Sequence, residues 1–354
     1  MKKNLLTYAL IVLSIVFLSS CSIKESSKSE NTVLRIAMVT DGGGISDQGF
    51  NQSIWEGLKE LENQNKAKVS YLESKSNADF SNNFDKLAEK NDIVIGVGFT
   101  IEDSIVSAAE QNKNTEFIAV DITPKKKVEN LCSIDLNAHE ASFLTGYIAS
   151  KMTKTGKIGF VGGIKSFPID QLKCGFEAGI LLGQKELNKN INLQVQYAGS
   201  FSDTSKCKAV AQSMISSGCD IIFHAAGGGG LGIFEAVKES NNNNSNEVKN
   251  FAIGVDKDQS IYAPEYTLTS AIKNLGEAVK HVCDYYIKNG KFEKNEFKMG
   301  LKEECVGLPK KNKNIPENVM KEVESIINKI ISSEINPPDN EASLKDFEKK
   351  LQNK

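Results

Sequence analysis

The chain has 354 residues, and its 43 lysines and arginines are balanced by 45 aspartates and glutamates, for a formal net charge of −2. No basic stripe stands out, which argues against a nucleic acid as the partner. Even without its first twenty residues the chain is longer than one hydrophobic core usually serves, so two domains are expected.

The amino terminus has the pattern of an export signal. Lys2 and Lys3 precede an apolar run over residues 5–18, which is shorter than a typical membrane span. We therefore expect a signal peptide over residues 1–20. Leu18-Ser19-Ser20-Cys21 resembles a bacterial lipobox, in which Cys21 is lipidated; the alternative is an ordinary secretory signal with an incidental cysteine. The polar segment 21–32 is then a tether, and the protein is expected at the cell membrane, anchored by lipid without spanning the bilayer.

The first half of the remaining chain alternates strands with helices. Such alternation predicts a parallel sheet covered by helices on both faces. The expected strands are 33–39, 68–72, 92–98, 116–120 and 131–136, and the expected helices are 53–61, 80–89 and 101–111.

The pattern then repeats. The expected helices are 138–152, 169–187, 204–217 and 231–240, and the expected strands are 157–161, 193–198, 220–224 and 251–255. Two similar doubly wound α/β halves in one exported chain predict a bilobed receptor with a ligand cleft between its lobes.

The final third is expected to return to both lobes. We expect a strand over 266–272, a helix over 275–288, a strand pair over 297–301 and 305–308, and a helix over 319–331. The first lobe would comprise 33–136 joined by about 260–305, and the second 137–259 joined by about 306–336. Residues 337–354 are polar and are expected to form a loosely attached tail.

A glycine-rich loop over residues 39–52 follows the first expected strand. Ligands of open α/β sheets bind at the carboxyl ends of strands. Asp41 and Asp47 supply acceptors, Asn51 supplies an amide, and Phe50 supplies a stacking face. This mixture suits a small polar ligand with a flat ring. The alternative is a tight turn in which Asp47 caps the helix and Phe50 lies in the core.

Further candidates occur at later strand ends. They are Asp121, Phe201, Phe223, Asp256 and Lys273, and their recurrence in both halves favours a shared cleft. The run Gly227–Gly230, which includes Gly228, lacks the lysine and hydroxyl of a phosphate-binding loop, and close backbone packing near a ligand or a flexible turn is expected.

The sequence gives little support for catalysis. His139, His224 and His281 lie in separate segments, and neither a nucleophile elbow nor a zinc-protease helix occurs. The six cysteines after Cys21 form no CxxC pair, which argues against a zinc site, and their apolar settings favour buried thiols. We expect a binding protein without catalytic residues, metal or cofactor.

Five motifs in order, together with the lipobox, resemble the basic membrane protein family of lipoproteins, which includes the purine nucleoside receptors of spirochaetes. The resemblance covers about residues 33–335. Its motifs are Asp47-Gln48-Gly49-Phe50-Asn51-Gln52, Phe143-Leu144-Thr145-Gly146-Tyr147, Lys157-Ile158-Gly159-Phe160-Val161-Gly162-Gly163, Gly175-Phe176-Glu177-Ala178-Gly179 and Gly254-Val255-Asp256-Lys257-Asp258-Gln259.

The resemblance implies a type I periplasmic-binding-protein fold and the substrate-binding role of an ABC importer, with an ABC permease as partner. It also implies a purine held between two aromatic rings, Phe50 and Phe223, with Phe201 as the alternative to Phe223. Asn51 and Asp121 would bind the base. Asp256 and Lys273 would bind the ribose hydroxyls, with Asp41 and the backbone around Gly228 nearby.

This chain departs from the family pattern at three places. It has Ser46-Asp47-Gln48-Gly49 where family members often have Asp-Asp-Lys-Ser, and the preceding Gly42-Gly43-Gly44 is unusually rich in glycine. It also has His139 where an acidic or amide residue is common. Two other functions on the same fold stay open: a receptor for a sugar or other small molecule, and a surface adhesin or antigen with a vestigial cleft.

Overall fold

The computed structural model describes residues 33–243, 248–292 and 294–353. The expected signal peptide 1–20, the tether 21–32 and the lipidation site Cys21 lie outside the described residues. The helices and strands of the described residues belong to the compact unit Leu34–Lys354. Within the described part of the chain, no helix is both long and apolar enough to cross a bilayer.

The first lobe is built on a six-stranded parallel sheet with the strand order β11-β5-β4-β3-β1-β2. Its strands are β1 Leu34–Val39, β2 Ala67–Leu72, β3 Ile93–Val97, β4 Glu116–Val120, β5 Leu131–Leu136 and β11 Glu296–Met299. Its helices are α2 Phe50–Asn63, α3 Phe80–Ala88, α4 Glu102–Gln111 and α9 Leu275–Asn289.

The alternation of side chains along β1 shows why helices cover both faces of this sheet. Ile36 and Met38 belong to the core cluster that contains residues of α2 and α9, whereas Ala37 and Val39 pack with residues of α3 and α4. Successive side chains of a strand point to opposite faces, so an uninterrupted apolar strand requires helices on both sides.

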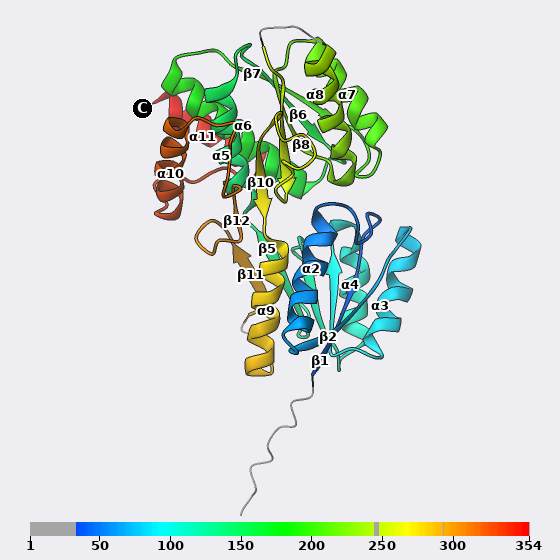
Figure 1. The fold of residues 1–354 in the computed structure, drawn as a ribbon. Helices are drawn as coiled ribbons and strands as arrows, with labels where there is room; N and C mark the ends of the chain where they lie inside the picture. The colour runs from blue at the N-terminus through cyan, green and yellow to red at the C-terminus, as the bar shows by residue number, and fades with distance from the viewer. Residues whose placement is uncertain (1–32, 244–247, 293, 354) are drawn as a thin grey trace, which may run out of the picture. The chain divides into compact units, whose positions relative to one another are not determined.

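The second lobe has the strand order β12-β10-β9-β8-β6-β7, in which the short β12 runs antiparallel to β10. Its strands are β6 Lys157–Gly162, β7 Asn192–Tyr197, β8 Ile221–Ala225, β9 Phe251–Asp256, β10 Thr267–Lys273 and β12 Val306–Gly307. Helices α5 Ala138–Met152 and α6 Phe167–Leu187 pack with one core cluster, and α7 Thr204–Ser216 and α8 Leu231–Asn243 pack with the other. Figure 1 shows the two lobes and the labelled elements of each.

Two glycines in the sequence motifs explain the close contact of α5 with α6. A Cβ atom at Gly146 would lie 2.0 Å from the Phe176 carbonyl oxygen, and one at Gly179 would lie 2.0 Å from the Phe143 carbonyl oxygen. Any larger residue would push the helices apart. These motifs therefore have a packing role.

The chain crosses between the lobes between β5 and α5, between β10 and α9, and between β11 and β12. Two expectations need correction here. Because β10 pairs with β9 in the second sheet, the return to the first lobe begins at α9 and not near residue 260. The strands β11 and β12 were expected to pair with each other, but each joins a different sheet.

The expected loose tail is instead helix α11 Glu341–Gln352, which follows α10 Glu317–Ile331. Leu344 is buried, and the Phe347 ring lies 5.8 Å from the Phe143 ring in an edge-on arrangement. The Asn340 side chain caps the helix by accepting from the backbone N–H groups of Ala342 and Ser343 at 3.0 Å. Figure 1 shows α11 at the C-terminus beside α6.

The six cysteines that follow Cys21 are all buried free thiols, as expected from their apolar surroundings. They are Cys132, Cys174, Cys207, Cys219, Cys283 and Cys305.

Candidate functional site

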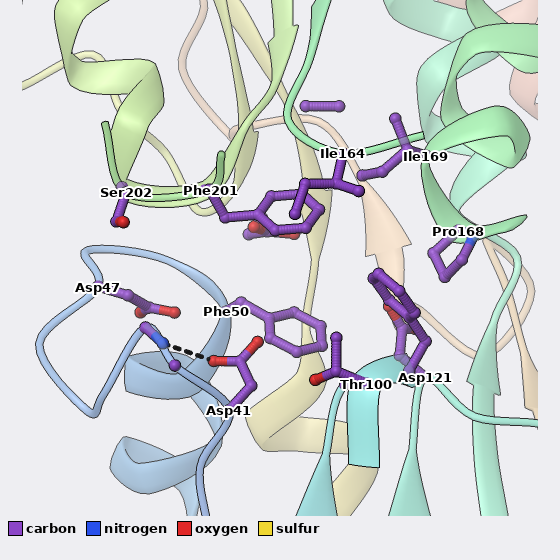
Figure 2. Close-up of a pocket in the computed structure, with 18 of the residues that line it drawn as sticks. Asp41, Asp47, Phe50, Thr100, Asp121, Ile164, Pro168, Ile169, Phe201 and Ser202 are labelled. Carbon is purple, nitrogen blue, oxygen red and sulfur yellow. Dashed lines mark hydrogen bonds between the residues drawn. The ribbon is translucent and has the colours of Figure 1, made fainter. Parts of the chain in front are cut away.

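A cavity of about 340 Å³ lies where the carboxyl ends of the strands in the two sheets face each other (Figure 2). This volume is within the range of small-molecule sites. The strand ends of the first lobe contribute Asp41, Gly98 and Asp121, and those of the second contribute Ala225, Asp256 and Lys273. Parallel strands bring residues that are far apart in sequence to one edge of a sheet. This is why the expectation that ligands bind at the carboxyl ends of strands locates this cavity.

Aromatic rings from both lobes line the cavity. Phe50 is the first residue of α2, and Phe201 lies in the loop between β7 and α7. Figure 2 shows their rings on opposite sides of the hollow, with Phe201 above Phe50 in this view. Phe99 lines the same cavity, and its ring centroid is 6.3 Å from that of Phe201. The cavity can therefore enclose a flat ring between aromatic faces.

A buried group of charges forms one wall of the cavity. The Lys273 ammonium, at the end of β10, lies 2.5 Å from an Asp121 carboxylate oxygen at the end of β4, so this ion pair joins the two lobes. The same ammonium lies 5.3 Å from the centre of the Phe50 ring, within cation–π range.

Burial controls the protonation of this group. Burial raises the pKa of the Asp256 carboxyl to about 7, although the nearby Lys273 ammonium acts in the opposite direction. Burial lowers the pKa of Lys273, but the carboxylates of Asp121 and Asp256 outweigh this effect, so its pKa is raised overall and the amine stays charged. The wall thus offers an ammonium donor and carboxyl groups that can accept or donate a hydrogen bond.

Asn51 does not line the cavity, although the resemblance implied that it binds the ligand. Its amide nitrogen is 2.8 Å from Asp41 Oδ1 and 2.9 Å from Asp47 Oδ2, so both amide protons are used within the protein. Asp41 also accepts from the Gly43 N–H at 2.9 Å and does line the cavity. Burial raises the pKa of Asp41 against these stabilising hydrogen bonds. Asn51 therefore orients a carboxylate of the site.

The alternative reading of the first loop is partly right. Asp47 accepts hydrogen bonds from the backbone N–H group of Gly49, just before α2, and from those of Asn51 and Gln52 in its first turn. It thus satisfies N–H groups at the helix start, although the N-cap residue itself is Gly49 and not Asp47. Phe50, however, lines the cavity and is only half-buried. One loop supplies both a helix cap and a cavity wall.

Phe223 lies in the core and not in the cavity. Its ring is 4.9 Å from that of Phe176 and 5.5 Å from that of Phe160, and it is fully buried. Both faces of β8 are covered, so a residue inside this strand has no route to the cleft. Phe201, the alternative, occupies the cavity instead. The glycine turn supports it, because the Gly229 N–H donates to the Phe201 carbonyl at 2.9 Å, and Gly228 lines the cavity.

Several lining residues were not anticipated, among them Phe99, Thr100, Ile164 and Ser202. Phe99 and Thr100 follow Gly98 at the end of β3, so their position at a strand end could have indicated that they line the cavity. Ile164 follows β6 in the same way. The Phe99 ring is a signal of the same kind as the one that indicated Phe50, whereas the side chain of Ile164 gave none and only its position indicates the site.

Two doubly wound lobes, joined by crossing segments and enclosing a cavity at their strand ends, define an α/β periplasmic-binding-protein fold. A solute-binding protein of the ABC transporter system from Aeropyrum pernix K1 has this fold. It superimposes with a TM-score of 0.79 at 22% identity, covering 90% of this chain and 98% of that one.

Residues 34–341 match the Bmp family model, described as ABC transporter substrate-binding protein PnrA-like. Basic membrane protein A of Borreliella burgdorferi is 36% identical over 98% of this chain and 99% of its own length. The ABC transporter nucleoside-binding protein BmpA of Lactococcus lactis is 35% identical over 82% of this chain and 87% of its own length. The chain belongs to the Bmp family of ABC transporter substrate-binding proteins. Such a protein delivers a ligand to an ABC permease.

Proposed function

We propose that this protein is a lipid-anchored receptor that binds purine nucleosides in the cavity between its lobes and delivers them to an ABC permease. The PnrA-like family and the relative from Lactococcus lactis, whose name includes nucleoside binding, support this choice of ligand.

The pair of aromatic rings on opposite lobes is the observation on which the proposal depends most. A purine between Phe50 and Phe201 would gain stacking on both faces, and stacking tolerates different purines because each presents a π face. Each ring belongs to a different lobe, so such a ligand would also favour closure of the cleft.

The polar wall provides partners for the sugar. We assign Asp256 and Lys273 to the ribose hydroxyls and Asp121 to the base. We assign Asp41 and the backbone at Gly228 to the remaining polar groups of the nucleoside. A site built to hydrogen-bond hydroxyl groups discriminates strongly against analogues that lack them, because its buried polar groups are then left unpaired. We therefore expect ribonucleosides to bind more tightly than free bases.

The test is mass spectrometry of the small molecule that co-purifies with the chain, followed by calorimetric titration with guanosine, adenosine, inosine and ribose. Tight binding of at least one purine nucleoside supports the proposal. Binding of ribose alone would point to a sugar receptor. A folded protein that binds none of the four would overturn the proposal and favour an adhesin or another ligand class.

The lipid anchor is proposed at Cys21. Metabolic labelling with a fatty-acid analogue tests it. We expect label and membrane association in the wild-type protein and loss of both in Cys21→Ala. Cys219→Ala, which alters a buried thiol of the second lobe, is the control and should retain both. Equal labelling of the two variants would rule out Cys21 as the anchor.

A further inference from the structure

We propose that His224, a buried residue outside the cavity, is a positioning residue that fixes the cavity carboxylate Asp256 by way of Gln259. The consequence for affinity rests on the proposed nucleoside site, whereas the geometric claim can be tested without any ligand.

The backbone at Asp256 needs such support. Asp256 has a φ of 66°, which is uncommon for a residue other than glycine. The Lys257 N–H donates to the Val255 carbonyl at 2.8 Å, across Asp256. A three-residue turn with positive φ at its centre is rare and strained, and such strain persists only where the surroundings enforce it.

Gln259 holds Val255, the first residue of this turn. Its side-chain oxygen accepts from the Val255 N–H at 2.9 Å, and its own backbone N–H donates to the Ser270 hydroxyl at 3.2 Å. Both backbone polar groups of Val255 are thus engaged, the N–H by Gln259 and the carbonyl by Lys257. The hydrogen bonds at Val255 therefore fix the turn that sets the direction of the Asp256 carboxylate.

His224 completes this support. Its Nε2 lies 2.9 Å from the same Gln259 oxygen, and both residues are buried. The backbone donor at Val255 shows that the Gln259 atom facing it is the oxygen, so Nε2 must carry the hydrogen and donate it. Burial lowers the pKa of His224 to about 4, which keeps the ring neutral and leaves it a single N–H for this bond.

The same ring also touches the glycine turn that lines the cavity. A Cβ atom at Gly230 would lie 2.1 Å from the Nδ1 and Cε1 atoms of His224, so only glycine allows this contact. Gly227 and Gly228 of this turn line the cavity. Nδ1 has no hydrogen-bond partner among the described residues. A phenylalanine here would be an apolar ring of similar shape without the N–H, which makes it a suitable test.

The first arm of the test uses the unliganded full chain. Carbon NMR of labelled aspartate follows the titration of Asp256 in the wild type, His224→Phe and His224→Gln. We expect the pKa of Asp256 to fall by about one unit in His224→Phe, because a loosened turn lets water reach the carboxylate. His224→Gln, whose amide can donate to Gln259, should restore the wild-type titration. His281→Phe, which alters an exposed histidine of α9, is the control.

The second arm measures guanosine affinity by calorimetry. We expect His224→Phe to weaken binding about tenfold in the wild-type background and to have no further effect in an Asp256→Asn background, because both act through one carboxylate. If guanosine fails to bind the wild-type protein, the proposed function fails, and the titration of Asp256 still decides whether His224 positions it.

A purely structural role predicts a lower thermal midpoint for His224→Phe with an unchanged Asp256 titration, and this result would overturn the proposal. If His224→Phe does not fold, nitrogen NMR of the wild-type imidazole decides instead. A hydrogen on Nε2 is the expected tautomer, and a hydrogen on Nδ1 would contradict the arrangement.

Discussion

At the scale of single residues, the cavity is defined by aromatic faces and by buried carboxyl groups. Phe50 and Phe201 approach it from different lobes, while Asp256 and Lys273 come from neighbouring strands of the second sheet. The two kinds of group lead to separate predictions, because stacking depends on the area of the rings, whereas the charge of the carboxyl groups depends on pH.

We expect Phe50→Ala and Phe201→Ala each to weaken guanosine binding, since the loss of one stacked ring costs about 1–3 kcal/mol, or roughly 5- to 150-fold in Kd. Isothermal calorimetry measures this directly. Phe167→Ala, which removes a ring that is 55% exposed on α6, is the control and should bind like the wild type. Equal affinity of all three variants would contradict a stacked base.

Asp256 should make the unliganded protein less stable as pH rises. Its raised pKa of about 7 means that the folded state keeps a proton that the unfolded chain releases near pH 4, so folding binds a proton between these values. The free energy of unfolding should fall with rising pH through this window, by at most about 1.4 kcal/mol per pH unit. Asp135, whose pKa burial raises to about 6, contributes in the same direction.

Denaturant unfolding at a series of pH values from 4 to 8 measures the slope. We expect a shallower slope for Asp256→Asn, in which the titrating group is absent, than for the wild type. Asp258→Asn alters an exposed carboxylate two residues along and should leave the slope unchanged. Parallel curves for the wild type and Asp256→Asn would show that Asp256 ionises as freely as in the unfolded chain.

At the scale of elements, α11 shows how a polar segment can belong to the core. It begins at Glu341, the last residue of the range 34–341 that matches the family model. Leu344 and Phe347 are three residues apart and thus lie on one helical face, which packs on the second lobe. Lys173, also buried, forms an ion pair with Glu341 at the start of the helix.

We expect Leu344→Ala to lower the free energy of unfolding by about 2 kcal/mol, because it leaves a cavity beneath the helix. Lys345→Ala changes the adjacent exposed residue and should have little effect. Chemical denaturation compares the two. A loosely attached tail would instead give the same stability for both variants.

Most helices and strands could be predicted from the sequence, but the residues at which they begin and end were predicted less accurately. The helix expected over 53–61 is α2 Phe50–Asn63, so Phe50 stands on its first turn. The strand expected over 266–272 is β10 Thr267–Lys273. Its sheet was predicted wrongly, because hydrophobic period identifies a strand but not the neighbour with which it pairs.

At the scale of the whole described unit, contacts outside the cavity also join the lobes. The Tyr262 hydroxyl donates to the Gln48 side-chain oxygen at 2.8 Å, and the Lys257 ammonium lies 2.7 Å from a Glu56 carboxylate oxygen. Tyr262 and Lys257 follow β9 in the second lobe, whereas Gln48 and Glu56 lie at the start of the first. These contacts favour the closed cleft and should slow ligand release.

We expect Tyr262→Phe to raise the dissociation rate of guanosine about two- to tenfold, because one hydrogen bond contributes about 0.5–1.5 kcal/mol and this one exists only while the lobes touch. Stopped-flow fluorescence measures the rate. Tyr285→Phe on α9 is the matched control. An unchanged rate would show that the Tyr262 hydroxyl does not contribute to closure.

The sequence by itself determined the two wound lobes, the cleft at their strand ends and most of its polar residues. These features depend on local period and on chain order, and parallel strands always present their carboxyl ends together. Asp41, Phe50, Asp121, Asp256 and Lys273 could be found in this way.

Only the tertiary structure decided which side chains reach the cavity. It placed Phe201 there and Phe223 in the core, engaged the amide of Asn51 with two aspartates, and brought His224 and Gln259 together behind Asp256. Each of these outcomes depends on contacts between segments far apart in the chain. The direction of a side chain at such a contact is set by packing, which residue type and spacing alone do not specify.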